Sequence, residues 1–194
     1  DAVILDGELI SSGSRYLKTC NGLDAMAQAI ESYWAVGSNN ESEEYSFRAI
    51  ELAWKIFPQF ISGSSQNDNC QHMIEAANLA GRAINISKTT AAHAWSYAFT
   101  SEFSIPHGHA IWLTLPAIFN SHLNATSEEI SPMIDISRFK DKMQKLVKIL
   151  GLNQKLNAEE QLNNFLSDLL YLIYQFLYLK SYKFRVGKLL KHSC

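Results

Sequence analysis

A chain of 194 residues has the length of one domain and can bury a core. With 47% hydrophobic residues, 19% charged residues and a net charge of −2, it lacks the charge pattern of a nucleic-acid groove or a membrane surface. Three scattered cysteines without a CxxC spacing indicate free thiols of a reducing compartment. We therefore expect a cytoplasmic protein without nucleic-acid or membrane partners.

The first residues predict a short strand. Residues 2–5 (AVIL) form an apolar run that begins without a turn, as the last strand of a preceding unit would. On this interpretation the chain is a fragment whose N-terminal part is absent.

Helical periodicity dominates the rest of the chain, apart from the opening run. Two capping-box patterns, Thr126-x-x-Glu129 and Asn157-x-x-Glu160, predict two later helix starts. Before them, helices are expected over residues 22–35, from 41 to a stop near Pro58, over 71–86, up to the break at Pro106, and from 107 into 120.

The segment 165–182 (FLSDLLYLIYQFLYLKSY) is unusually apolar and aromatic. A membrane span is one interpretation, but Asp168 and Gln175 interrupt the segment. Its clean apolar stretch, residues 169–174, is far shorter than the ~20 residues that a span needs. We therefore expect a core or interface helix here, within an atypical tail over residues 160–194.

Four polar residues indicate a metal site. Asp24 and Gln28 lie four residues apart on one face of an expected helix. His93 comes from another helix, and His107 opens a third, where the helix dipole disfavours its protonation. Gly108 beside it permits a close backbone approach. Carboxylate, amide and neutral imidazole groups all bind divalent metals, although each residue taken singly is more often a capping, solvated or core residue.

Two segments resemble the iron-containing alcohol dehydrogenase family: GLDAMAQAIESYW at 22–34 and HAWSYAFTSEFSIPHGHAIWLTLP at 93–116. The resemblance covers roughly residues 1–120. It implies an all-α fold, the helical metal-binding domain of the dehydroquinate synthase-like and iron-containing alcohol dehydrogenase fold, with a short leading strand. Residues 1–17 would then be the residual strand and linker of an absent nucleotide-binding domain, and residues 18–194 the helical domain.

The resemblance also implies the ligands. Asp24, His93 and His107 match metal ligands of the family, and Gln28 stands where most members carry a ligand histidine. A neutral amide is a weaker ligand than imidazole for iron or zinc. The implied cofactors are a divalent metal, Fe²⁺ or Zn²⁺, and NAD(P)H in the full-length protein.

A substrate site is implied as well. Tyr97 stands where many members carry a second histidine near the substrate, and Tyr97 or His109 would relay the proton. Residues 28–34 (QAIESYW) and residues 85–90 (NISKTT), which precede the helix expected to carry His93, are similar to the phosphonoacetaldehyde reductase branch of the family. There Lys88, Thr89 and Thr90 would suit an anionic phosphonate, and a solvated loop position is the alternative for Lys88.

The implied function is that of a metal-dependent, NAD(P)-linked alcohol dehydrogenase or aldehyde reductase. Its substrate would be a small aldehyde or alcohol, with phosphonoacetaldehyde as the first candidate. Assembly into a homo-oligomer is a further option. Because the sequence has no Gly-rich phosphate cradle, we expect the isolated chain to be inactive. The alternative class is a non-catalytic helical fragment with a decayed metal site. Glycerol dehydrogenase-like or dehydroquinate synthase-like chemistry is a third option.

Overall fold

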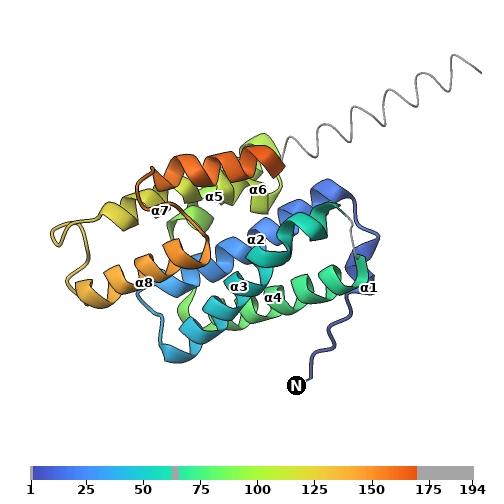
Figure 1. Cartoon of the computed structure of the whole chain (residues 1–194), viewed down its shortest axis with the longest axis horizontal. Helices are drawn as coiled ribbons and strands as arrows, with labels where there is room; N and C mark the ends of the chain where they lie inside the picture. The colour runs from blue at the N-terminus through green and yellow to red at the C-terminus, as the bar shows by residue number, and fades with distance from the viewer. Residues whose placement is uncertain (1, 63–65, 170–194) are drawn as a thin grey trace, which may run out of the picture.

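A computed structural model of the protein describes residues 2–62 and 66–169 (Figure 1). Within these ranges every regular element is a helix, which confirms the expected all-α class. Residues 158–169 form a further helical segment after the labelled helices. The labelled helices are α1 (Glu8–Ser11), α2 (Arg15–Trp34), α3 (Asn40–Ser62), α4 (Gln66–Ser87), α5 (Ala91–Phe103), α6 (His107–Trp112), α7 (Leu115–Asn124) and α8 (Ile136–Ile149).

Helix α2 runs through the middle of the fold (Figure 1). It contacts α3, α4, α6 and α8, and it is buried on almost every side from Lys18 to Trp34. The lack of a side chain at Gly22 lets α3 approach closely, because an added Cβ there would lie 2.4 Å from a ring carbon of Phe57. Side chains of α2 therefore face several other helices, so α2 can contribute to a site assembled from distant segments.

The helical segment 158–169 completes the core. Leu162 and Leu166 are buried, and the ring centroid of Phe165 lies 4.3 Å from that of Trp54 and 5.8 Å from that of Trp112. The start of the aromatic segment is therefore a core helix, as expected, while the tail from residue 170 onward lies outside the described residues. Among the helices in the described part, none combines the length and the hydropathy that crossing a membrane would need.

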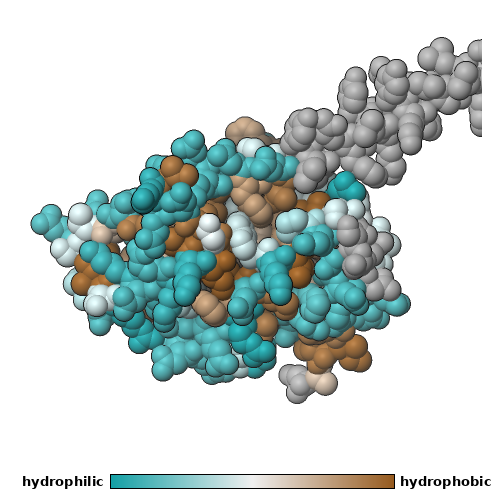
Figure 2. All heavy atoms as spheres, viewed as in Figure 1, coloured by the Kyte–Doolittle hydropathy of each residue, from teal (hydrophilic) through white to brown (hydrophobic). Residues whose placement is uncertain are grey.

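The expected leading strand is wrong. Residues 2–6 have no regular structure, and Val3 and Ile4 are 70% and 92% exposed. Figure 2 shows apolar atoms gathered on the surface near the N-terminal end of the described chain. A strand requires a neighbour to satisfy its backbone N–H and C=O groups, and the described ranges contain no other strand. The expected boundary between residues 17 and 18 falls inside α2.

The expected end of a helix near Pro58 is also wrong, because α3 continues to Ser62. Proline removes one helical hydrogen bond, and Pro58 itself is exposed. Beyond it, Phe60 and Ile61 are buried and stabilise the last turn. Burial outweighs the local helix-breaking effect of proline.

Two boundaries after the histidines differ from expectation. The single helix expected over residues 107–120 is split into α6 and α7, because Pro116 favours a new helix start. The helix start predicted at Thr126-x-x-Glu129 is wrong. The Thr126 N–H and hydroxyl both donate to Glu129 Oε2, but turns follow instead of a helix, since Pro132 disfavours helix in the residue before it. The second predicted start is confirmed: the Glu160 N–H donates to Asn157 Oδ1, 3.1 Å away, and a helix follows.

Candidate metal centre

Three separate helices bring Asp24, His93 and His107 to one point. Asp24 lies in the middle of α2, His93 in the first turn of α5, and His107 is the first residue of α6. Each offers one ligand atom, and these atoms all lie within 4.8 Å of one another. Residues that are far apart in the sequence thus form one cluster.

Two atoms of this cluster lack hydrogen-bond partners. Asp24 Oδ1 and His93 Nε2 are buried, and neither has a hydrogen-bond partner. They lie 3.4 Å apart, which is close enough for an ion pair when the ring is protonated but long for a hydrogen bond. By contrast, two ligand atoms bound tetrahedrally at about 2.1 Å from one ion are separated by about 3.4 Å. The donor set of one carboxylate and two imidazoles, with two buried atoms that lack hydrogen bonds, fits a divalent ion such as iron or zinc.

Both imidazoles are oriented by a hydrogen bond at Nδ1. His93 Nδ1 contacts the carboxylate of Glu31, an acceptor that requires an N–H. His107 Nδ1 lies 3.2 Å from the Ser96 hydroxyl, whose single proton is donated to the His93 carbonyl oxygen at 2.7 Å. Ser96 must therefore accept the Nδ1–H of His107. In both neutral rings Nε2 is left with the lone pair that metal binding needs.

The charge state of His93 depends on its two carboxylate neighbours. Burial lowers the pKa of His93, but the carboxylates of Asp24 and Glu31 outweigh burial and raise the pKa to about 9. At neutral pH the ring of the metal-free protein therefore carries a second proton, on Nε2 beside Asp24 Oδ1. A metal ion bound by Nε2 would have to displace that second proton.

Gly108 allows α6 to rest directly on α2. A Cβ at this position would overlap the Cys20 carbonyl oxygen and lie 2.9 Å from the Asp24 backbone nitrogen. The expected close backbone approach is confirmed. This contact holds His107, the preceding residue, beside Asp24.

The other predicted residues of the site occupy different places. Gln28 lies one turn beyond Asp24 on α2 and is half-buried. Tyr97 is 65% exposed, and its ring stacks on that of His107 with centroids 5.5 Å apart, so it lies on the solvent-exposed side of the cluster. His109 instead contacts Tyr16, whose hydroxyl lies 3.1 Å from Nδ1, and burial lowers the pKa of His109.

The predicted substrate-binding residues form the turn between α4 and α5. Lys88 is exposed with a φ of 68°, and its ammonium donates to the Asn85 carbonyl oxygen at 3.2 Å. Thr89 is half-buried. The Thr90 hydroxyl is engaged in the interior, where it donates to Glu31 and accepts from Trp34 Nε1 at 3.0 Å.

Sequence reasoning missed Glu31. It lies two helical turns after Asp24, on the same side of α2, and its side chain is fully buried. Its position seven residues after Asp24, next to the apolar Ile30, is a signal that could have identified it, because a charged side chain on the buried side of a helix needs a partner.

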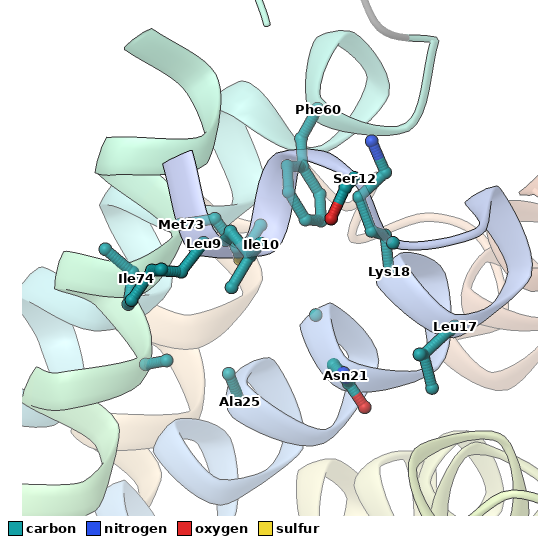
Figure 3. A pocket seen from close by; sticks show the side chains of 13 residues that line it. Leu9, Ile10, Ser12, Leu17, Lys18, Asn21, Ala25, Phe60, Met73 and Ile74 are labelled. Carbon is teal, nitrogen blue, oxygen red and sulfur yellow. The ribbon is translucent and has the colours of Figure 1, made fainter. Parts of the chain in front are cut away.

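A separate cavity of about 330 Å³ lies between α1, α2 and α4 (Figure 3). Its walls are mainly apolar, with Leu9, Ile10 and Met73 among the residues that line it. Lys18 also lines it, and its ammonium lies 5.6 Å from the centroid of the Phe60 ring. Because none of the three clustered residues lines this cavity, we assign it no part of the metal chemistry.

These features define a class: an all-helical domain whose separate helices assemble a carboxylate–imidazole cluster suited to a metal ion. Residues 18–183 match the model of the Fe-containing alcohol dehydrogenase family, C-terminal part. The chain belongs to this family.

Several relatives are similar to parts of the chain. Phosphonoacetaldehyde reductase of Streptomyces viridochromogenes is 32% identical over 114 residues, which cover 59% of this chain and 29% of the relative. The bifunctional aldehyde-alcohol dehydrogenase AdhE of Escherichia coli is 26% identical over 156 residues, which cover 79% and 18%. The solved sulfoacetaldehyde reductase from Bifidobacterium kashiwanohense, in complex with NAD+, aligns with a TM-score of 0.60 at 26% identity, covering 87% and 46%. The chain thus spans less than half the length of each.

Proposed function

We propose that this chain is the metal-binding part of an NAD(P)-linked, metal-dependent alcohol dehydrogenase that interconverts a small alcohol and its aldehyde. The convergence of Asp24, His93 and His107 carries the proposal, since two of their ligand atoms are buried without hydrogen bonds. Family membership supports the reaction class. The free thiols of Cys20 and Cys70 support a reducing, cytoplasmic setting.

Asp24, His93 and His107 would hold the metal, which when bound supplies Lewis-acid polarisation of a substrate oxygen. Tyr97 lies on the solvent-exposed side of the cluster, where its hydroxyl would hold the proton that the substrate oxygen gains or loses. His109 is less suited to this step because its ring already contacts Tyr16. The nicotinamide would be bound by the remainder of the full-length protein, because this sequence has no Gly-rich phosphate cradle.

Metal removal tests the function in the full-length protein that contains this chain. NAD(P)H oxidation with a small aldehyde should disappear after treatment with a chelator and return with Fe²⁺ or Zn²⁺. Undiminished turnover by a preparation shown to contain no metal would refute the proposal.

We infer that the substrate is a small aldehyde with an anionic group, phosphonoacetaldehyde being the first candidate. The support comes from two relatives whose names denote aldehydes with a phosphonate or a sulfonate group. Lys88 is the exposed cation in the turn that leads into α5. Thr89 is its neighbour. The Thr90 hydroxyl is already bonded to Glu31 and Trp34, so Thr90 would support the turn rather than bind the substrate.

Lys88→Gln in the full-length enzyme should raise KM about tenfold or more for phosphonoacetaldehyde and leave KM for a neutral aldehyde of similar size unchanged. The charge that is removed is one that only the anionic substrate uses. Steady-state kinetics with both substrates measure the difference. An equal change for the two substrates would assign Lys88 to the turn rather than to the substrate.

One observation favours a second function. Gln28 stands one turn from Asp24, where the family pattern has a ligand histidine, which is what a decayed site in a non-catalytic helical domain would show. Gln28→His should tighten zinc binding about tenfold if the site is functional, because an imidazole is a better zinc ligand than an amide. Zinc titration of both forms checks this result. No saturable zinc binding by either form would favour the non-catalytic domain.

Metal affinity should rise with pH. Because Asp24 and Glu31 hold the pKa of His93 at about 9, the ring must lose one proton before it can bind zinc. Below that pH each unit of increase should strengthen zinc binding about tenfold, with release of about one proton per zinc. Calorimetry in buffers of different ionisation enthalpy measures the proton count. An affinity independent of pH between 6 and 8 would exclude His93 as a ligand.

A further inference from the structure

Glu31 places a carboxylate in the fully buried interior beside the cluster of Asp24, His93 and His107. The exposed fraction of its side chain is 0%, and it accepts hydrogen bonds from one short segment at the start of α5. The donors are the Thr90 N–H at 3.1 Å, the Ala92 N–H at 3.0 Å, the Thr90 hydroxyl and His93 Nδ1. A buried carboxylate is tolerable only when its acceptor sites are filled in this way.

The two oxygens of Glu31 have different partners. Oε1 accepts from the Thr90 N–H, the Thr90 hydroxyl and the Ala92 N–H, whereas Oε2 contacts His93 Nδ1. Thr90 is the N-cap residue of α5, but its side chain makes no capping bond. Oε1 of Glu31 supplies that acceptor from another helix. One oxygen therefore anchors the start of α5, and the other faces the imidazole.

The contact at Oε2 has a consequence for Nε2 of the same ring. A carboxylate oxygen only accepts, so the neutral ring must carry its proton on Nδ1. Nε2 then has its lone pair directed to the side of Asp24, whose Oδ1 lies 3.4 Å away. Hydrogen bonds of this kind fix the tautomer and the orientation of histidines that bind metals.

We propose that Glu31 is a positioning residue of the metal site, which holds His93 in the tautomer that binds the ion and so sets the metal affinity. This inference rests on the proposed function. Glu31 does not touch the ion or the substrate. It acts through His93.

Glu31→Gln separates this role from simple anchoring of α5. Three donors converge on Oε1, so the amide oxygen of Gln should take that place and preserve the anchor. The amide NH₂ group then meets His93 Nδ1 as a donor. It forces the proton onto Nε2, which faces the metal position.

Zinc titrations of the wild type, Glu31→Gln and Thr90→Val give the first test. Glu31→Gln should keep its helical content and bind zinc 10–100-fold more weakly. Thr90→Val is the matched control: it removes a donor to Oε1 and the acceptor for Trp34, but leaves the contact at Oε2. It should lower the melting temperature and keep the wild-type zinc affinity. Equal affinity in Glu31→Gln and the wild type, or equal weakening in both variants, would overturn the proposal.

Imidazole proton–nitrogen NMR spectra of the metal-free chain give a second test that does not depend on metal binding. At about pH 10, above the pKa of about 9 for His93, the wild type should show the Nδ1–H tautomer of this ring. Glu31→Gln should show the Nε2–H tautomer. If the wild type bound no zinc, the proposed function would fail, while these spectra would still decide the role of Glu31. An Nε2–H tautomer in the wild type would overturn that role, even if Glu31→Gln did not fold.

Discussion

Adding one methyl group at Gly108 is expected to lower the free energy of unfolding by more than about 4 kcal/mol. A Cβ at this position meets backbone, the Cys20 carbonyl and the Asp24 nitrogen, rather than the end of a flexible side chain. Helix α6 would have to move away from α2. His107 would move with it, so Gly108→Ala should weaken metal binding as well.

Gly81→Ala is the matched control for Gly108→Ala. Gly81 lies within α4, and an added Cβ there meets nothing within 4 Å. The same change should therefore stabilise the protein by about 0.5–1 kcal/mol, because alanine favours helix. Urea denaturation of the two variants measures the contrast. Similar midpoints would show that the contact between α6 and α2 is looser than described.

His93→Ala is expected to weaken zinc binding by more than about a thousandfold, since it removes a ligand atom at the centre of the cluster. It should also lower the free energy of unfolding by about 3 kcal/mol, because the buried carboxylate of Glu31 loses its partner at Oε2. Zinc titration and urea denaturation measure the two effects.

His72→Ala provides the comparison for His93→Ala. His72 is an exposed histidine on α4 and takes no part in the cluster. Its removal should change neither zinc affinity nor stability by more than about 0.5 kcal/mol. Loss of zinc binding in this variant would place the metal elsewhere.

Local patterns were sufficient to predict most of the helices. The apolar period over residues 22–35 marks the most buried helix, α2, and Pro106 marks the boundary between α5 and α6. Local patterns failed where distant partners decide the structure. The apolar run at residues 2–5 forms no strand because the described ranges offer none to pair with, and α3 passes Pro58 because Phe60 is buried beyond it.

The candidate site divides in the same way. Asp24, His93 and His107 could be proposed from residue type, spacing and the family pattern, and the structure brings them together. The partners at Nδ1 could not be found in this way. Glu31 meets His93 only because α5 starts against α2, and Ser96 meets His107 only because α6 lies beside α5. Both contacts depend on the packing of helices.

X-ray absorption of the zinc-loaded chain tests the central claim most directly, because it reports the atoms bound to the ion. The cluster of Asp24, His93 and His107 predicts two imidazole nitrogens and at least one oxygen at about 2.0–2.2 Å, without sulfur. A spectrum with a sulfur ligand at about 2.3 Å, or without imidazole scattering, would contradict the account.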